Sequence, residues 1–396
     1  MINEKMIKKG TNRSKIRELF EYGKILKKTV GEENVFDFTL GNPSAKTPKI
    51  INETLIKLLE TDGVHLYTSA QGDESARIAI VDTIKNRYGF GYNKDLIYIT
   101  CGAASGLAIT LRALISKKSD CVLALTPYFP EYAVFTENAG AKFKAVNCNK
   151  RDFSIDFKDL ERKLTKNVQV LIINTPNNPS GAVYSEEDVI KLSKILSDKQ
   201  KEYGHPIYLL TDEPYREITF DGGVIPFIPK YYDNTIVCYS YSKSLSLSGE
   251  RIGYLAISEK CENYKDVYSA CLGAGRSLGY VCAPSLFQKL IAKCSNELCD
   301  MSVYKDNRDI LVENLTKFGF NCVNPKGAFY LFLKCPISDA NEFSDVAKEL
   351  GLLLVPSNTF GLNGYVRIAT CVPKSVVINS LKAFEKLAKI YNLKVK

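Results

Sequence analysis

The sequence predicts an α/β fold with a large, mostly parallel β-sheet flanked by helices, and a smaller α+β module beside it. Between about residues 96 and 257, short apolar runs rich in β-branched residues alternate with helical patterns, as in βαβ units. After about residue 285 the chain instead gives a long helical stretch followed by strands of alternating polarity. We expect an N-terminal arm that joins the small domain, a large domain and a small C-terminal domain, over residues 1–49, 50–285 and 286–396.

The composition is that of an ordinary globular protein, with 45% hydrophobic and 24% charged residues among 396. The N-terminus lacks the apolar core of a signal peptide, and no apolar run reaches the roughly 18 residues of a membrane span. We therefore expect a cytoplasmic protein without membrane contact. The net charge is +9, but lysines and arginines are spread along the chain, which favours a solvated surface over a nucleic-acid interface.

The twelve cysteines occur singly, mostly in apolar surroundings, and none forms a Cys-x-x-Cys pair. The chain has only two histidines, His65 and His205. This pattern argues against a zinc site and predicts free, buried thiols in a reducing compartment.

Helical and strand patterns before residue 90 predict the first elements of the chain. These are a helix at 11–30, a strand at 35–40, a helix at 48–59 opened by Pro48, and a helix at 74–88. Gly41-Asn-Pro43 interrupts them with either a simple turn or a close approach of the backbone to a ligand. Residues 65–72 form an irregular stretch that contains Tyr67.

Apolar runs of strand length then predict the large sheet. The strands are expected at 96–100, 121–125, 142–147, 168–174, 207–212, 234–239 and 254–257, with helices at 107–115, 157–164 and 186–196. In the smaller module we expect helical structure over 284–318, strands at 327–333, 352–356 and 364–369, a helix at 342–350 and a final helix.

Groups of distinctive residues follow several strands at the point where each strand ends. They occupy residues 101–107, 126–132, 174–181, 212–215 and 240–254. Because ligands of parallel sheets bind at the carboxyl ends of the strands, we expect these groups to meet. The small residues of Cys101-Gly-Ala-Ala-Ser-Gly-Leu107 precede a helix, where backbone N–H groups bind phosphate or where small residues permit tight packing.

The segment Ser240–Tyr254 contains a lysine, Lys243, directly after a buried strand. Desolvation and the nearby cation Arg251 would lower the pKa of this amine, which favours a Schiff base with an aldehyde. The hydroxyls of Ser240 and Ser242 and the Arg251 guanidinium suit a phosphate. By itself the segment is equally compatible with a serine-rich surface loop and a solvated lysine.

Taken together, the motifs resemble those of the class I and II aminotransferases, fold-type I enzymes of pyridoxal 5′-phosphate that include the aspartate aminotransferases. The resemblance extends from about Ile16 to the C-terminus. It is carried, in order, by Asn174-Thr-Pro-Asn-Asn-Pro-Ser-Gly181, Asp212-Glu-Pro-Tyr215, Ser240-Tyr-Ser-Lys243 with Arg251, and Tyr365-Val-Arg-Ile-Ala369. It implies a sheet of the seven-stranded type.

The resemblance also implies roles around the cofactor ring. Lys243 would carry the cofactor as a Schiff base, and Asp212 would keep the pyridinium nitrogen protonated. Tyr215 and Asn178 would bind the phenolic oxygen. Phe129 would stack on the ring, with Tyr128 as the second candidate, and core packing is the alternative for both.

For the phosphate, the resemblance implies Ser240, Ser242, Arg251 and the backbone at Gly102, Ala103 and Ala104. Tyr67 would reach the phosphate of a neighbouring subunit, so that a homodimer shares its active sites; otherwise Tyr67 is a packing residue. Arg367 would take the substrate α-carboxylate, helped by Asn178 and the Gly41 backbone. The alternative for Arg367 is a surface arginine.

The expected reaction is a reversible ping-pong transamination from an L-amino acid to a 2-oxo acid such as 2-oxoglutarate, with aspartate as a candidate donor. Arg276 and Arg17 are candidates for contacting substrate, or they are structural or solvated. Three alternatives remain: a carbon–sulfur β-lyase or cyclopropane-forming synthase on the same fold, an inactive ligand-binding relative, and a cofactor-sensing module of a regulator. The last needs a DNA-binding domain, whereas only about 30 residues precede the first core strand.

Overall fold

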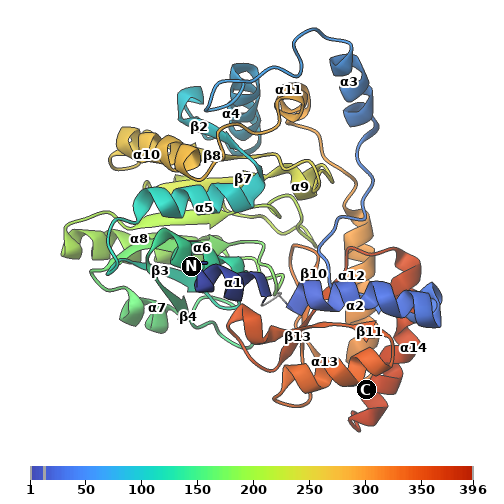
Figure 1. Ribbon diagram of the computed structural model, residues 1–396. Coiled ribbons are helices and arrows are strands. Elements are labelled where there is room, and N and C mark those ends of the chain that lie inside the picture. Colours follow the sequence, from blue (N-terminus) through green and yellow to red (C-terminus); the bar gives the residue numbers. More distant parts are fainter. Residues whose placement is uncertain (1, 12–14, 395–396) are drawn as a thin grey trace.

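The computed structural model describes residues 2–11 and 15–394, and its centre is a seven-stranded sheet (Figure 1). The strand order is β2-β8-β7-β6-β5-β3-β4, in which β8 runs antiparallel to both neighbours and every other pair is parallel. The predicted α/β fold with a mostly parallel sheet is confirmed. The strands are β2 (Ile97–Thr100), β3 (Cys121–Leu125), β4 (Lys142–Val146), β5 (Val168–Asn174), β6 (Tyr208–Asp212), β7 (Thr235–Ser240) and β8 (Gly253–Ile257).

Helices cover both faces of this sheet because successive side chains of a strand point to opposite sides. In β7, Ile236 and Cys238 pack under one set of helices, while Val237 and Tyr239 pack under the other. The first face carries α5 (Gly102–Leu114), α6 (Glu131–Ala139) and α10 (Tyr264–Ser277). The second carries α4 (Glu74–Tyr88), α7 (Phe157–Lys163), α8 (Glu186–Tyr203) and α11 (Ser285–Cys294), and α3 (Lys49–Leu59) packs on α11.

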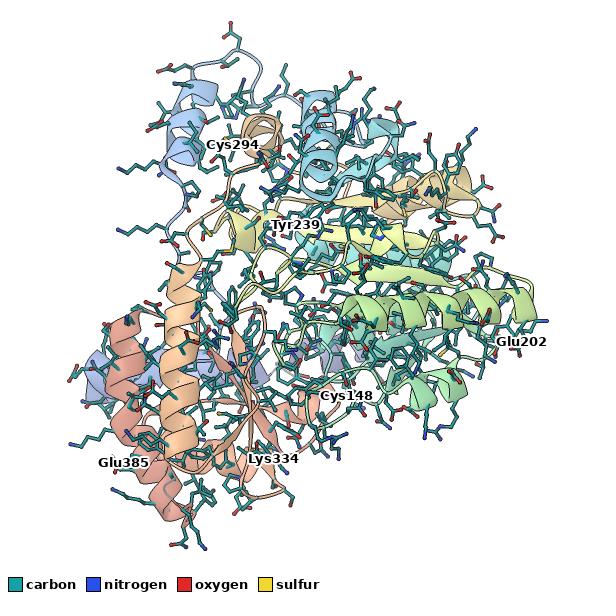
Figure 2. All side chains as sticks on the ribbon, turned by 180° about the vertical axis from the view of Figure 1, so that it is seen from behind. Cys148, Glu202, Tyr239, Cys294, Lys334 and Glu385 are labelled. Atoms are coloured by element: carbon teal, nitrogen blue, oxygen red, sulfur yellow. The ribbon has the colours of Figure 1, made fainter. Side chains whose placement is uncertain are left out.

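The smaller module is built on a second, antiparallel sheet of order β12-β13-β10-β9. Its strands are β9 (Asn321–Cys322), β10 (Tyr330–Lys334), β12 (Val355–Pro356) and β13 (Tyr365–Ala369). The helices of this module are α2 (Lys15–Val30), α12 (Ser302–Lys317), α13 (Ala340–Glu349) and α14 (Lys374–Ile390). Seen from behind (Figure 2), Tyr239 lies in the large sheet and Lys334 in this smaller one.

The N-terminal segment joins the C-terminal module. Strand β1 (Phe36–Asp37) pairs in parallel with β11 (Leu352–Leu353), and Phe38 is buried in the same hydrophobic cluster as strand β10. This pairing supports the proposed assignment of the arm to the small domain. The exact domain boundaries stay a prediction. The remaining helices are α1 (Glu4–Thr11) and the short α9 (Tyr241–Ser244).

Several predicted boundaries are wrong. Helix α8 ends at Tyr203 rather than at 196 because good helix formers continue without apolar periodicity until Gly204, in the left-handed conformation, ends it. Helix α5 starts at Gly102 rather than 107, and only Phe36–Asp37 of the predicted strand 35–40 pairs. The predicted helix start at residue 11 falls partly on residues 12–14, which lie outside the described residues.

The predicted helical stretch 284–318 is in fact two helices, α11 and α12. Between them, the Cys299 N–H donates to the Ser244 carbonyl at 2.9 Å, and the Cys299 thiol lies 3.4 Å from the Lys243 carbonyl oxygen. The chain therefore leaves helical geometry here to contact the lysine segment. Helices α6 and α10 were not expected from the sequence. Helix α6 has only weak apolar periodicity, and it follows directly on a proline-rich strand end.

All twelve cysteines are free, nine of them buried, so the prediction of free and mostly buried thiols is confirmed. Across residues 2–11 and 15–394, no group of three or more His, Cys, Asp or Glu side chains is arranged to hold a metal ion. None of the helices in these same residues combines the length and apolar character that a membrane span requires.

Candidate active site

A cavity of about 290 Å³ lies where the predicted strand-end motifs meet. Strand β6 ends at Asp212, and β7 leads into α9, which carries Lys243. The cavity is lined by Ile16, Gly41, Ala103, Ala104, Leu107, Phe129, Asn178, Asp212, Pro214, Tyr215, Ser240, Ser242, Lys243, Ser248, Arg251, Tyr330 and Arg367. Most of the residues singled out in the sequence are therefore brought together, although they are spread over more than 300 positions.

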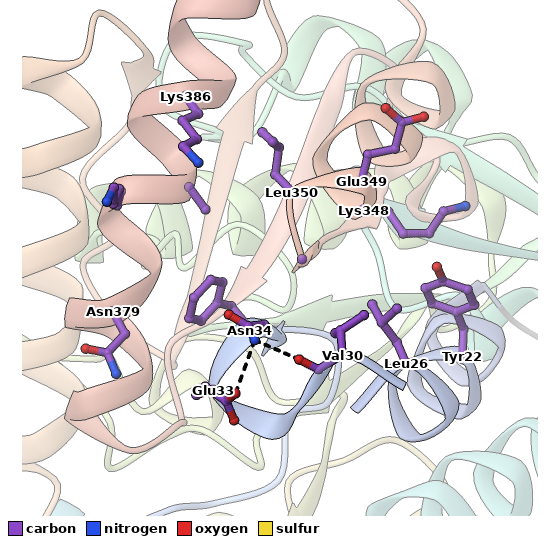
Figure 3. Close-up of a pocket in the computed structure, with 14 residues that line it drawn as sticks. Tyr22, Leu26, Val30, Glu33, Asn34, Lys348, Glu349, Leu350, Asn379 and Lys386 are labelled. Atoms are coloured by element: carbon purple, nitrogen blue, oxygen red, sulfur yellow. Dashed lines mark hydrogen bonds between the residues drawn. The ribbon is translucent and has the colours of Figure 1, made fainter. Parts of the chain in front are cut away.

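A larger cavity of about 750 Å³ lies elsewhere, between α2, the end of α13 and α14 (Figure 3). None of the sequence-predicted site residues lines it. In this region the Asn34 amide donates to the Val30 carbonyl at 2.7 Å and to the Glu33 carboxylate at 3.2 Å, both close neighbours in the chain (Figure 3). The smaller cavity is the better candidate because buried ionisable groups with displaced pKa values converge on it.

Lys243 lies on α9, just beyond the carboxyl end of strand β7, and is largely removed from water. Its ammonium donates to the Gly41 carbonyl oxygen at 2.6 Å and lies 5.4 Å from the centre of the Phe329 ring. Burial above all, together with the nearby cations Arg251 and Arg367, lowers the pKa of Lys243 to about 8. An appreciable fraction of this amine is therefore unprotonated, and nucleophilic, near neutral pH.

Asp212 is the carboxylate at the floor of the cavity. The Tyr132 hydroxyl donates to its Oδ2 at 2.6 Å, whereas its Oδ1 is buried without a hydrogen-bond partner. Burial raises the pKa of Asp212 to about 7, against which the Tyr132 hydrogen bond acts only in part. A buried carboxylate oxygen without a partner is costly and is suited to a donor supplied by a ligand.

Arg367 is almost fully buried, with 2% of its surface exposed. It donates to the Asn178 side-chain oxygen at 3.1 Å and to the Thr39 carbonyl at 2.5 Å. Its guanidinium lies over the rings of Tyr330 and Phe360, at 4.6 and 5.3 Å from their centres. This packing fixes the plane of a cation that can bind a carboxylate in a bidentate manner.

The N-terminus of α5, the Ser240 loop and Arg251 form one electropositive corner. The hydroxyls of Ser240 and Ser242 lie 2.7 Å apart, and Arg251 donates to the Ser248 carbonyl at 2.9 Å. Gly102 has a positive φ of 77°, and a Cβ there would lie 2.8 Å from the Arg251 guanidinium. Only glycine leaves this helix N-terminus open beside the arginine, as an anion site requires.

The two aromatic residues predicted to stack on the cofactor ring lie in different places. Phe129 lines the cavity, while Tyr128 packs edge-on against Phe143 with ring centres 5.0 Å apart and is not among the lining residues described above.

Tyr67 lies in the loop between α3 and α4, is 97% exposed and does not line the cavity of its own chain. Arg276 is exposed on α10, and neither it nor Arg17 is among those lining residues.

Some cavity or supporting residues were assigned no role from the sequence, among them Ile16, Ser248, Tyr132 and Tyr330. Tyr132 and Tyr330 are ordinary core tyrosines by pattern, and only their partners distant in the chain reveal them. Tyr132 meets a residue 80 positions away, and Tyr330 meets Tyr215 across 115 positions.

Comparison with known proteins agrees with this geometry. Residues 33–384 match the model of the family described as aminotransferase class I and II. The chain is 30% identical to an aspartate aminotransferase of Pyrococcus horikoshii, over 94% of each chain, and 28% identical to an aromatic-amino-acid aminotransferase of Thermococcus litoralis, over 96% of each. A crystal structure of an amino transferase from Eubacterium rectale is 50% identical over 99% of both chains, with a TM-score of 0.96.

The family match covers most of the chain, and the solved relative shares the whole fold. The relatives named above are aminotransferases, and none is a lyase. The chain belongs to the class I and II aminotransferases and is an enzyme that transfers amino groups.

Proposed function

We propose that this enzyme uses pyridoxal 5′-phosphate to move an amino group from an L-amino acid to a 2-oxo acid, with 2-oxoglutarate as the expected acceptor. The observation that carries the proposal is the convergence of a desolvated lysine, a desolvated carboxylate and a buried arginine on one cavity. Such a set pairs a nucleophile with separate groups for a cationic ring and an anionic substrate.

The residues present suit the cofactor on which this family in general depends. The buried, unpartnered Oδ1 of Asp212 suits the protonated ring nitrogen, and the opening that Gly102 leaves beside Arg251 suits the phosphate. Ser240, Ser242 and the backbone of Ala103 and Ala104 would complete the phosphate site. When bound, the cofactor supplies an aldehyde that takes up amino groups and a ring that withdraws electrons from the substrate Cα.

Lys243 would hold the cofactor through its amine and, once the substrate amine replaces it, would move a proton from the substrate Cα. Its lowered pKa supports both roles, because the amine must be unprotonated to attach and to accept a proton. Asp212 would keep the ring nitrogen protonated. Tyr215 and Asn178 would donate to the phenolic oxygen, and Phe129 would cover the ring face.

Arg367 would bind the substrate α-carboxylate, with Asn178 and the Gly41 backbone beside it. Its burial against two aromatic rings supports this role, since a desolvated guanidinium gains strongly from a bidentate carboxylate. A lysine would offer only a point charge and would not reproduce this geometry.

The proposed function is tested by adding pyridoxal 5′-phosphate to the purified protein and assaying amino transfer. We expect a visible absorption band and amino transfer with ping-pong kinetics. The donors to compare with 2-oxoglutarate are aspartate and phenylalanine, with release of thiol and pyruvate from cystathionine as the lyase control. A protein that shows no absorption band and no amino transfer with any donor would refute the proposal.

Among donors, we propose aspartate first, because an aspartate aminotransferase is among the relatives at 30% identity. Arg251 and Arg367 are the arginines that line the cavity in the described part of the chain. A second arginine for the distal carboxylate would have to come from a neighbouring subunit or from a movement of this chain. Cytoplasmic location stays a prediction from the sequence.

We further propose a homodimer in which Tyr67 reaches the phosphate of the neighbouring active site. Tyr67 and its sequence neighbour Leu66 are both exposed, as is Ile56 on α3, and exposed apolar side chains support burial against a second copy. Subunits with Tyr67→Ala and subunits with Lys243→Met, each expected to be weakly active, are to be mixed and allowed to reassort.

If Tyr67 acts across subunits, a mixed dimer has one complete site, and about a quarter of wild-type activity should return. No recovery after proven exchange of subunits would mean that Tyr67 acts within its own chain or not at all.

A further inference from the structure

Tyr330 connects two parts of the cavity that are expected to bind different parts of the ligands. It is the first residue of β10 and is buried, with 3% of its surface exposed. Its hydroxyl lies 3.0 Å from the Tyr215 hydroxyl, and the centre of its ring lies 4.6 Å from the Arg367 guanidinium. One side chain thus contacts the residue expected at the cofactor's phenolic oxygen and the residue expected at the substrate carboxylate.

The ring of Tyr330 restricts Arg367. The guanidinium lies over this ring and over that of Phe360, and its two terminal nitrogens donate to Asn178 and Thr39. Arginine has several rotatable bonds, so a fixed plane requires contacts with rings as well as at the edge. Removing the Tyr330 ring would remove the shorter of these two cation–ring contacts.

The hydroxyl of Tyr330 is confined at the opposite end. A side chain at residue 41 would collide with this hydroxyl, and the Gly41 carbonyl is the acceptor of the Lys243 amine. Burial raises the pKa of Tyr330 to about 12, so this phenol keeps its proton at neutral pH. Its sequence neighbours Phe329 and Leu331 are apolar, and its hydrogen-bond partner is the Tyr215 hydroxyl.

Two hydroxyls in contact share one hydrogen bond, and either can be the donor. If Tyr330 donates, the Tyr215 oxygen is satisfied as an acceptor and the Tyr215 proton is directed to a different acceptor. If Tyr215 donates, its proton is directed to the Tyr330 oxygen and is not available to hydrogen-bond a ligand. The two arrangements therefore predict opposite effects when the Tyr330 hydroxyl is removed.

We propose that Tyr330 is a positioning residue that donates to Tyr215, so directing the Tyr215 proton into the cavity, while its ring holds the Arg367 guanidinium in place. This inference rests on the proposed function, because it assigns the Tyr215 proton to the anionic phenolic oxygen of the bound cofactor. Hydrogen bonds to an anionic oxygen stabilise the deprotonated form of a group coupled to it. The Tyr330 hydroxyl should therefore lower the pH at which the bound cofactor titrates.

The test compares Tyr330→Phe, which removes only the hydroxyl, with Tyr330→Leu, which also removes the ring. Tyr304→Phe is the matched control, because Tyr304 is equally buried in the same aromatic cluster but does not line the cavity. Each protein is loaded with pyridoxal 5′-phosphate, its visible absorption is titrated with pH, and the KM for the amino donor is measured.

In Tyr330→Phe we expect the titration midpoint to rise by about half to one pH unit, and kcat to fall about three- to tenfold, as for loss of one hydrogen bond. The KM for the donor should stay within about twofold, because the ring on Arg367 remains. Tyr330→Leu should raise that KM about tenfold as well, and Tyr304→Phe should leave the midpoint unchanged.

A midpoint that stays constant or falls in Tyr330→Phe, while the wild-type protein shows a normal band, would overturn the inference alone. Equal KM values in the Phe and Leu variants would overturn the role of the ring. If the wild-type protein shows no band with the cofactor, the proposed function fails and this inference fails with it.

Discussion

Lys243→Met is expected to lower kcat by at least about 10³-fold and to abolish the visible absorption band of the cofactor-loaded protein. The variant keeps the length and apolar stem of the side chain but removes the amine that attaches the cofactor and carries the proton. Proton transfer by a positioned group alone contributes about 10²–10⁴-fold. Stopped-flow absorbance and steady-state amino transfer are the measurements.

Lys260→Met is the matched control for this variant. Its amine lies 6.0 Å from the Phe90 ring, as that of Lys243 lies 5.4 Å from Phe329, but Lys260 does not line the cavity. It should retain the absorption band and near wild-type kcat. A Lys243→Met protein that keeps full amino transfer would contradict the assignment of Lys243 as the cofactor lysine.

The positions of Lys243 and Asp212 were predictable because each follows an apolar strand whose end is set by local sequence. In a parallel sheet the carboxyl ends of such strands share one edge, so two separate motifs could be brought together without knowledge of their contacts. The same reasoning extends to Arg251, which lies eight residues beyond Lys243 before the antiparallel strand β8.

Contacts between tyrosines could not be predicted in this way. Tyr132 lies on α6, whose apolar periodicity is too weak to suggest a helix, and its partner Asp212 comes from another βαβ unit. The alternating pattern of β10 places Tyr330 on one face of a strand but does not say that Tyr215 or Arg367 lies opposite. The break at 295–301 likewise depends on a tertiary contact, that of Cys299 with the lysine segment.

The pH dependence of stability in the cofactor-free protein follows from the opposite displacements of two pKa values. Burial raises the pKa of Asp212 from 3.8 to about 7, so its proton is bound more tightly in the folded state. The unfolding free energy therefore falls as pH rises from about 4 to about 7. Burial lowers the pKa of Lys243 from 10.5 to about 8. Burying the protonated amine therefore lowers the unfolding free energy by its full amount below about pH 8, and the unfolding free energy recovers as pH rises further.

These two groups should give the cofactor-free enzyme a local minimum of stability between about pH 7 and 8. At about 1.4 kcal/mol per pKa unit, Asp212 costs about 4 kcal/mol there and Lys243 about 3 kcal/mol. Asp212→Asn should therefore stabilise the cofactor-free protein at pH 8 by a few kcal/mol, while lowering kcat of the loaded enzyme at least about 10²-fold. Urea unfolding of both proteins from pH 4 to 9 gives the difference curve.

Asp159→Asn is an informative control because its effect should have the opposite sign. Although burial raises the pKa of Asp159, the Asn147 N–H and the Lys163 and Arg162 cations lower it to about 2. Asp159 therefore stabilises the fold at neutral pH, and that contribution is lost as pH falls below about 4 towards 2. Its asparagine variant should be less stable than wild type at pH 8, where Asp212→Asn is more stable.

Cofactor binding should remove the stability minimum, because it gives the Asp212 carboxylate a cationic partner and uses the Lys243 amine in attachment. The difference between Asp212→Asn and wild type should accordingly shrink or reverse when both proteins are loaded with pyridoxal 5′-phosphate. A difference curve that is flat from pH 4 to 8 without cofactor would show that Asp212 is not desolvated in the folded protein. Conversely, a steep curve without cofactor that is unchanged by cofactor would mean that the ring nitrogen does not meet Asp212. The loss of stability that Asp212 and Lys243 cause in the cofactor-free protein therefore also reports which ligand groups this site binds.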